Sequence, residues 1–302
     1  MKICVETRRR SAALLLALWA LFLLSAVVIS WALDIDTRLT LNGNASRVTE
    51  AEAMAASGSE IAMHPAVKPG SPLLRGGVSR TQTFEARISG EGGRLNINWL
   101  TAGENPQRLE LLRKYLEVKG VELNDRDKMI DCLLDWIDTD NLVRLNGAEA
   151  DGAYQPTNMA LTRVDELKRI KGWKDFTSQP DWDAGFTVNS TGPIDLAWAP
   201  REMLLALPGM TDQLVDAFLA LRRGKDGEDG TEDDAQFKSV EDVRLALGFT
   251  AEQFSRLAPL VGFKDPVVRV VSIGRSGDVK RTVQMVIRKA GNVPQLVTWK
   301  EL

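Results

Sequence analysis

The side chains best suited to chemistry in this sequence are acidic and gather in one segment, LLDWIDTDNLVRLNGAEADGAYQPTN at 133–158. Six oxygen-bearing side chains fall within 17 positions there: Asp135, Asp138, Asp140, Asn141, Glu149 and Asp151. Ca²⁺ binds about six to eight oxygen ligands, which a flexible loop can supply. The spacing differs from that of an EF-hand, so the segment predicts a structural Ca²⁺ site of another type. Helix capping plus a solvated acidic loop is the simpler alternative, with Asp135 as a structural hydrogen-bond acceptor.

A second acidic segment, GKDGEDGTEDDAQF at 224–237, crowds its carboxylates more tightly. Six of them fall within nine positions: Asp226, Glu228, Asp229, Glu232, Asp233 and Asp234. Like charges at this spacing repel one another unless a cation lies among them. The segment is therefore a second candidate Ca²⁺ site, and a solvated loop or a partner-facing patch explains it without a metal.

Catalytic motifs are scarce in this sequence. The chain has one histidine, His64, so a Ser-His-Asp triad or a multi-histidine metal site would depend on a single imidazole. The sequence contains no G-x-S-x-G, P-loop or H-E-x-x-H pattern. Carboxylate pairs in the acidic loops leave a membrane-tethered hydrolase as a weak alternative. We therefore expect a protein that is not an enzyme.

Residues 204–222, LLALPGMTDQLVDAFLALR, predict two helices joined by a Pro-Gly turn, which resembles a helix-hairpin-helix. Such hairpins often bind the DNA backbone, so a membrane-anchored DNA-binding protein is an alternative function. Across 196–264, however, 12 acidic side chains outnumber 8 basic ones. Because phosphate binding requires nearby positive charge, we interpret the hairpin as a structural, SAM-like module and do not expect nucleic acid as a partner.

The acidic segments and the hairpin lie in a block in which helical periodicity dominates. Capping residues precede several of its segments and glycines follow several of them. The expected helices are 105–120, 125–140, 163–173, 199–209, 210–224, 239–248 and 250–262.

Alternating apolar and polar residues on both sides of this block predict strands. Segments 81–90 and 94–100 are separated by Gly-Glu-Gly-Gly and predict a hairpin, and the expected C-terminal strands are 266–274, 281–289 and 296–302. We therefore expect an α+β fold: a long N-terminal helix packed on a small antiparallel sheet. Residues 34–104 and 264–302 would form this domain, and 105–263 would be an inserted helical domain.

The N-terminal segment 12–33 has 22 positions without a charge. At about 1.5 Å per residue, it spans a hydrocarbon core of about 30 Å. Arg8, Arg9 and Arg10 precede it and Asp34 follows it, so the positive-inside rule leaves residues 1–11 in the cytoplasm and the bulk of the chain outside. A cleaved signal peptide and a simple signal anchor are the alternatives.

The helical pattern continues beyond the apolar segment, since no proline interrupts it before Pro65. A membrane helix would then run without a break into an amphipathic helix. The apolar positions of this second half are Leu39, Leu41, Val48, Ala53 and Ala56.

Together these features resemble the type IV pilin-like superfamily and, within it, the K-type minor pseudopilins of type II secretion. RRRSAALLLALWALFLL is similar to a prepilin leader, and LLDWID with its acidic loop and Asn-Gly-Ala-Glu is similar to a K-type signature. RLNINWL and FTVNSTGPIDLAWAPREML resemble the Asn-rich segments of the family.

The resemblance implies that leader cleavage would fall between Ser11 and Ala12, although the family carries glycine where this chain has Ser11. The fifth mature residue would be Leu16, where most pilins carry glutamate and K-type members typically do not.

The resemblance implies a subunit at the tip of a periplasmic pseudopilus, anchored by a single pass in the inner membrane, that initiates assembly for protein export. Its implied partners are I- and J-type minor pseudopilins, the major pseudopilin and a prepilin peptidase, with the secretin and the exoprotein as further contacts. Methylation and structural Ca²⁺ binding are also implied, since members of the family are known to bind calcium.

Overall fold

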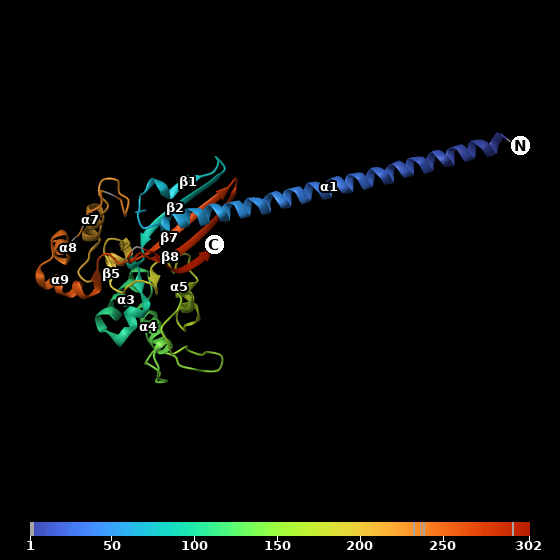
Figure 1. The fold of residues 1–302 in the computed structure, drawn as a ribbon. Coiled ribbons are helices and arrows are strands. Elements are labelled where there is room, and N and C mark those ends of the chain that lie inside the picture. Colours follow the sequence, from blue (N-terminus) through green and yellow to red (C-terminus); the bar gives the residue numbers. More distant parts are fainter. Residues whose placement is uncertain (1–2, 232, 236, 238, 292) are drawn as a thin grey trace.

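The computed structural model describes residues 3–231, 233–235, 237, 239–291 and 293–302. Helix α1 (Ile3–Met63) is a single rod, and its C-terminal end lies against an antiparallel sheet (Figure 1). The other helices gather beyond the sheet, at the opposite end of the molecule from the N-terminus. The structure therefore confirms the expected α+β class, with a long N-terminal helix, a small antiparallel sheet and many further helices.

The sheet joins the two ends of the sequence. Its order is β1 (Arg75–Gly77), β2 (Gln82–Gly90), β7 (Val267–Ser276), β8 (Val279–Arg288) and β9 (Gln295–Glu301), with every neighbouring pair antiparallel. A short 3₁₀ helix, η1 (Pro72–Leu74), precedes β1. The strands expected at 81–90, 266–274, 281–289 and 296–302 are confirmed. Burial alternates along most of β7, as in a half-covered sheet, whereas every residue of β9 is exposed.

Small residues hold α1 close to this sheet. Ala51, Ala55 and Ala62 are fully buried. A Cβ atom added to Gly274 of β7 would lie 2.0 Å from the carbonyl oxygen of Ala51, and one added to Gly58 would lie 2.4 Å from Ser272 Oγ. The backbones of helix and sheet therefore approach at distances that side chains larger than these would prevent.

The apolar positions expected for the second half of α1 lie only in part on the face that packs against the sheet. Leu41 and Ala53 are exposed, Val48 and Ala56 are half-buried, and the side chain of Leu39 lies outside the described residues. The hydrophobic pattern was weighted toward large side chains, whereas the close helix–sheet packing selects alanine, glycine and serine. Ser59, for example, is fully buried and donates its hydroxyl to the carbonyl of Ala55.

The hairpin expected from 81–90 and 94–100 was also wrong. The first segment forms β2, but after η2 (Glu91–Gly93) the second forms only β3 (Leu95–Asn96) and then turns into α2 (Ile97–Thr101). Asn96 caps α2, its side chain accepting the N–H of Trp99 at 3.1 Å. Leu95, Ile97 and Leu100 are buried in the core of the helical part, so the sheet layer ends at Gly90.

The helical part has its own hydrophobic core. After η3 (Ala102–Glu104), its longest helices are α3 (Pro106–Val118), α4 (Leu123–Ile137) and α7 (Asp212–Arg222). The shorter ones are η4 (Val164–Arg169), α5 (Lys174–Thr177), α6 (Arg201–Ala206), α8 (Val240–Ala246), α9 (Ala251–Leu257) and η5 (Ala258–Leu260). Two short parallel pairs complete it: β3 with β4 (Phe186–Thr187), and β5 (Ile194–Asp195) with β6 (Val261–Gly262).

A buried ion pair joins the helical part to the sheet. Glu91 is fully buried, and the guanidinium of Arg269 on β7 donates to both of its oxygens, at 2.7 and 2.8 Å. Arg94 and the hydroxyl of Thr187 on β4 complete its partners, at 3.2 and 2.5 Å. The charge is therefore paired and hydrogen-bonded from both parts of the molecule, as a buried charge requires.

Candidate functional site

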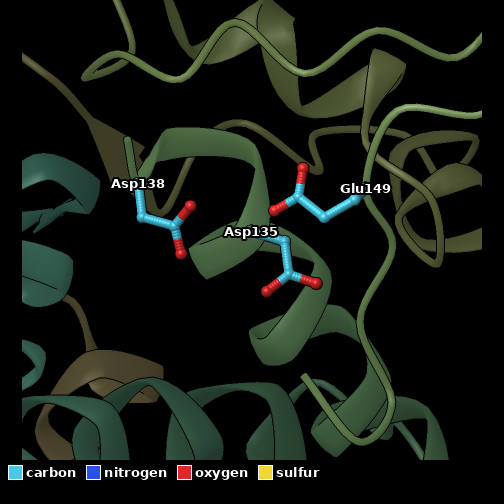
Figure 2. Close-up of side chains that lie close together, drawn as sticks. All are labelled: Asp135, Asp138 and Glu149. Carbon is cyan, nitrogen blue, oxygen red and sulfur yellow. The ribbon is translucent and has the colours of Figure 1, made fainter. Parts of the chain in front are cut away.

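The end of α4 builds the first acidic cluster. Asp135 lies in the last turn of α4 and Asp138 is its C-cap residue, three positions later and on the same side of the helix. The following loop returns Glu149 beside them, so that one oxygen from each of the three side chains lies within 4.8 Å of the others. In Figure 2, the carboxylates of Asp138 and Glu149 point toward each other, and Asp135 lies below Glu149 with its carboxylate directed downward.

A glycine allows the loop to approach Asp135. A Cβ atom on Gly147 would lie 1.9 Å from Asp135 Oδ2, so a larger residue there would push the loop away from the carboxylate. Asp131, one turn before Asp135, accepts the backbone N–H of Asn146 at 3.1 Å and its side-chain amide at 3.0 Å. These contacts fix the return of the loop and hence the position of Glu149.

The carboxylates differ in their partners. Asp135 is fully buried and accepts the guanidinium of Arg144 at 2.5 Å and the Arg144 N–H at 3.3 Å. The same guanidinium donates to Asp138 and, at 2.6 Å, to Glu104. Asp138 Oδ1 and both carboxylate oxygens of Glu149 are buried without a hydrogen-bond partner in the described part of the chain.

The surroundings of Glu149 disfavour its charged form. Its side chain is only 9% exposed. Burial raises the pKa of Glu149, the negative charges of Asp135, Asp138 and Asp140 raise it further, and the nearby N–H of Ala150 offsets only part of this shift. A buried carboxylate without a donor requires a proton or a cation. Its unpaired oxygens and the oxygen-only donor set therefore fit a hard divalent cation such as Ca²⁺.

The other three residues expected in this cluster lie apart from it. Asp140 is exposed and accepts the N–H of Leu142 at 2.8 Å, which makes it a turn residue. Asn141 and Asp151 are also exposed, and Asp151 bridges to Tyr154 through the backbone. Arg144 was not among the predicted site residues, although it is the one basic residue between Asp138 and Asp151.

The second acidic loop is assembled differently. Asp226, Asp233 and Asp234 bring their oxygens within 4.8 Å of one another. Asp233 accepts the N–H of Lys225 at 2.6 Å, and this bond is the main cause that lowers the pKa of Asp233 to about 2. Asp234 accepts the N–H of Gly230 at 2.6 Å. Backbone donors thus stabilise Asp233 in its charged form.

Three of the residues predicted for this second site have other positions. Asp229 lies 2.7 Å from the buried Arg222, which also donates to the carbonyls of Leu196 and Ala199, so Asp229 anchors the loop to the helical core. Glu228 is exposed and its backbone N–H bonds to Asp226. Glu232 lies outside the described residues.

The predicted hairpin is formed by α6 and α7, and its turn contains Gly209 with a φ of 82°. Arg201 on α6 would be a candidate phosphate ligand, but its guanidinium is bonded to Asp212 at 2.7 Å and to Asp216 at 2.9 Å. These contacts staple the two helices together and support a structural role for the hairpin.

The N-terminal half of α1 is the second candidate functional feature. It contains an 18-residue window of mean hydropathy 2.3, none of it buried, and within the described residues α1 is the one helix long and apolar enough to cross a membrane. Leu16 is 71% exposed. Ser11 and Ala12 lie within the helical backbone of α1, but their side chains lie outside the described residues.

Comparison with known proteins places part of the chain in a family. Residues 93–179 match the family model described as "Type II secretion system (T2SS), protein K". This range begins just after β2 and includes α3, α4 and the first acidic cluster.

A curated relative carries the same description. The type II secretion system protein K of Dickeya chrysanthemi is 31% identical over 74 residues, which are 24% of this chain. The match spans about a fifth of the relative's length, 21%.

A solved structure is similar over most of the chain. One chain in the crystal structure of the GspK-GspI-GspJ complex from the enterotoxigenic Escherichia coli type 2 secretion system superposes with a TM-score of 0.57. The similarity covers 89% of this chain and 98% of that one at 14% identity, and thus shows a common fold. The resemblance found in the sequence is therefore confirmed: through a protein K domain at residues 93–179, the chain is related to the K-type minor pseudopilins of type II secretion.

Proposed function

We propose that this chain is a minor pseudopilin that works by assembly and not by catalysis. The observation that carries the proposal is the division of α1 into two halves. The N-terminal half is apolar and exposed, whereas the C-terminal half is fixed on the sheet by small residues. An exposed apolar helix needs lipid or partner helices to cover it, so we assign α1 to the inner membrane and the rest of the chain to the periplasm.

We assign the subunit to the tip of a pseudopilus, where it initiates assembly. The protein K domain and the helices after it add a large body beside the pilin-like sheet, and such a body fits the end of a close-packed filament better than its interior. Leu16 supports the same position, because a subunit with nothing above it needs no glutamate to bind a neighbour's N-terminal amine.

The proposed partners are I- and J-type minor pseudopilins, because the similar crystal structure is that of a complex of GspK with GspI and GspJ. The major pseudopilin would lie below them, and a prepilin peptidase would cut between Ser11 and Ala12. The secretin and the exoprotein are further proposed contacts of the exposed body.

We also propose that Ca²⁺ has a structural role at the acidic clusters. Asp135, Asp138 and Glu149 would hold one ion, and Asp226, Asp233 and Asp234 another. A bound ion would supply positive charge to carboxylates that the fold forces together. Other residues hold the two loops in place without a metal: Asp131 and Gly147 position the first loop, and Arg222 anchors the second.

The partner proposal is tested by co-purification. The full chain, tagged and extracted in detergent, is co-expressed with the I- and J-type minor pseudopilins of its own secretion system. We expect both to elute with it in one complex, whereas an unrelated membrane-anchored protein with the same tag should retain neither. Elution of the chain alone, at a concentration where I and J bind each other, would contradict the proposal.

A further inference from the structure

The first acidic cluster already contains a positive charge of its own. Arg144 extends its guanidinium between Asp135 and Asp138, and one nitrogen, Nη1, donates to both carboxylates. The backbone N–H of Arg144 bonds to Asp135 as well. The arginine therefore occupies the space between two of the three carboxylates that could hold a metal ion.

The guanidinium of Arg144 does not pair with every carboxylate of the cluster. One guanidinium faces three carboxylates, and the third one, Glu149, accepts no hydrogen bond on either oxygen within the described part of the chain. Its side chain is more than nine-tenths buried and points at the cluster (Figure 2). The arginine thus satisfies Asp135 and half of Asp138 but leaves the buried charge of Glu149 unpaired.

We propose that Arg144 is an internal competitor for the cation site, and that a divalent ion binds by displacing its guanidinium from Asp135 and Asp138. The inference rests on the structural role proposed above for Ca²⁺. An ion that coordinates all three side chains needs the oxygens that Arg144 now holds, and two positive charges at such close range repel each other. A divalent ion also neutralises more of the cluster's charge than one guanidinium does.

Displacement would loosen a defined part of the loop. Arg144 stands among exposed apolar residues, with Leu142 75%, Val143 61% and Leu145 96% exposed. The contacts of Asp140 with Leu142 and of Asp131 with Asn146 do not involve the guanidinium. The release should therefore be confined to 143–145 and should make the Arg144–Leu145 bond more accessible.

Calcium affinity provides the first test. Full-length chain in detergent, stripped of metal with EDTA and then dialysed free of chelator, is titrated with CaCl₂ by calorimetry. We expect Arg144→Gln to bind Ca²⁺ about tenfold more tightly, because the competitor is gone, while Arg80→Gln in the exposed β1–β2 turn binds as the unmodified chain does. Equal or weaker binding by Arg144→Gln overturns the inference. Absence of binding in every variant overturns the proposed Ca²⁺ role along with it.

Limited proteolysis of the unmodified chain is the second test and needs no substitution at Arg144. Trypsin cleavage after Arg144, normalised to cleavage after Arg80, should become several-fold faster when Ca²⁺ is added. Glu149→Gln should remove this acceleration. Ca²⁺ that binds and instead protects the Arg144–Leu145 bond would show that arginine and metal are held together, contrary to the inference.

Discussion

Two buried glutamates show how position decides what a carboxylate does in this protein. Glu91 has Arg269, Arg94 and Thr187 as partners, and these lower its pKa although burial alone would raise it. Burial raises the pKa of Glu149, and the neighbouring carboxylates of Asp135 and Asp138 raise it further. The first is therefore a structural ion pair, and the second is a group that a cation would stabilise.

The Glu91 ion pair should dominate the acid stability of the junction. Because the folded-state pKa of Glu91 lies below its ordinary value of 4.5, its contribution is present above about pH 4.5 and is lost as pH falls through the lowered pKa. At pH 7, Glu91→Gln should reduce the free energy of unfolding by about 3 kcal/mol. Urea unfolding across pH measures this, and the variant and the unmodified chain should converge in acid. A constant difference at all pH values would refute the assignment.

Glu149→Gln, unlike Glu91→Gln, should stabilise the fold when no metal is bound. Because the folded-state pKa of Glu149 is raised, its ionisation destabilises the fold as pH rises above 4.5 and through the raised pKa. The neutral amide should therefore stabilise the metal-free chain at pH 7 by about 1 kcal/mol. In thermal melts with EDTA, Glu149→Gln should unfold at a higher temperature than the unmodified chain, and in saturating Ca²⁺ at a lower one. If Glu149→Gln still unfolds at the higher temperature in saturating Ca²⁺, Glu149 is not a ligand of the ion. Asp151→Asn, an exposed neighbour, is the control.

At the scale of elements, the contact between α1 and the sheet determines whether the rod and the body move as one. Glu50 on α1 accepts the hydroxyl of Ser276 at 2.6 Å, and the ammonium of Lys289 donates to the carbonyls of Ala62 and Val67 at 3.0 and 3.1 Å. These polar contacts lie at both ends of the stripe of buried alanines. The lysine also places a positive charge at the C-terminal end of α1, where the helix dipole favours one.

Gly274→Ala should break this contact. The added methyl group would lie 2.0 Å from the backbone of Ala51, so α1 must shift away from β7. We expect a loss of about 1–3 kcal/mol in the free energy of unfolding. Gly43→Ala is the matched control, because nothing lies within 4 Å of its Cβ position, and it should stabilise α1 by up to about 1 kcal/mol. Chemical denaturation followed by circular dichroism compares the two. Equal stability of both variants would contradict the close packing.

The elements that sequence patterns predicted well are those with a simple period. Burial alternates along most of β7, and α3, α4 and α7 present apolar residues at helical spacing. Asn105 and Thr211 also cap α3 and α7 with their side chains. The strand predicted for RLNINWL at 94–100 was wrong, because this pattern is equally compatible with one short strand followed by a helical turn. The signal that separates them is Asn96, whose side chain caps the N–H three residues later.

Loop geometry and long-range pairs lay beyond what one sequence can indicate. In each acidic segment, three predicted ligands came together within the described residues, because the turns of the loop, and not its composition, decide which carboxylates converge. The pairing of Glu91 with Arg269 spans 178 positions, and no local pattern links the two. Arg144, by contrast, is close in sequence to its partners, but a single basic residue among acidic ones is also typical of a solvated loop.

At the scale of the whole molecule, the fold combines a long helix with an apolar N-terminal half, a sheet whose strands come from both sides of the helical part, and a protein K domain beyond the sheet. The Glu91 junction and the α1–sheet contact make this a continuous mechanical connection. In the proposed pseudopilus, such a connection would transmit the position of α1 to the exposed body.

Secretion by the source strain tests this account most directly. The gene for this chain is deleted, and the exoproteins of its type II pathway are measured in the medium and in the periplasm. We predict that export stops, that exoproteins accumulate in the periplasm, and that the full chain restores export whereas residues 34–302 without the membrane helix do not. The strain must carry no second K-type subunit. Normal export after the deletion in such a strain would contradict the account.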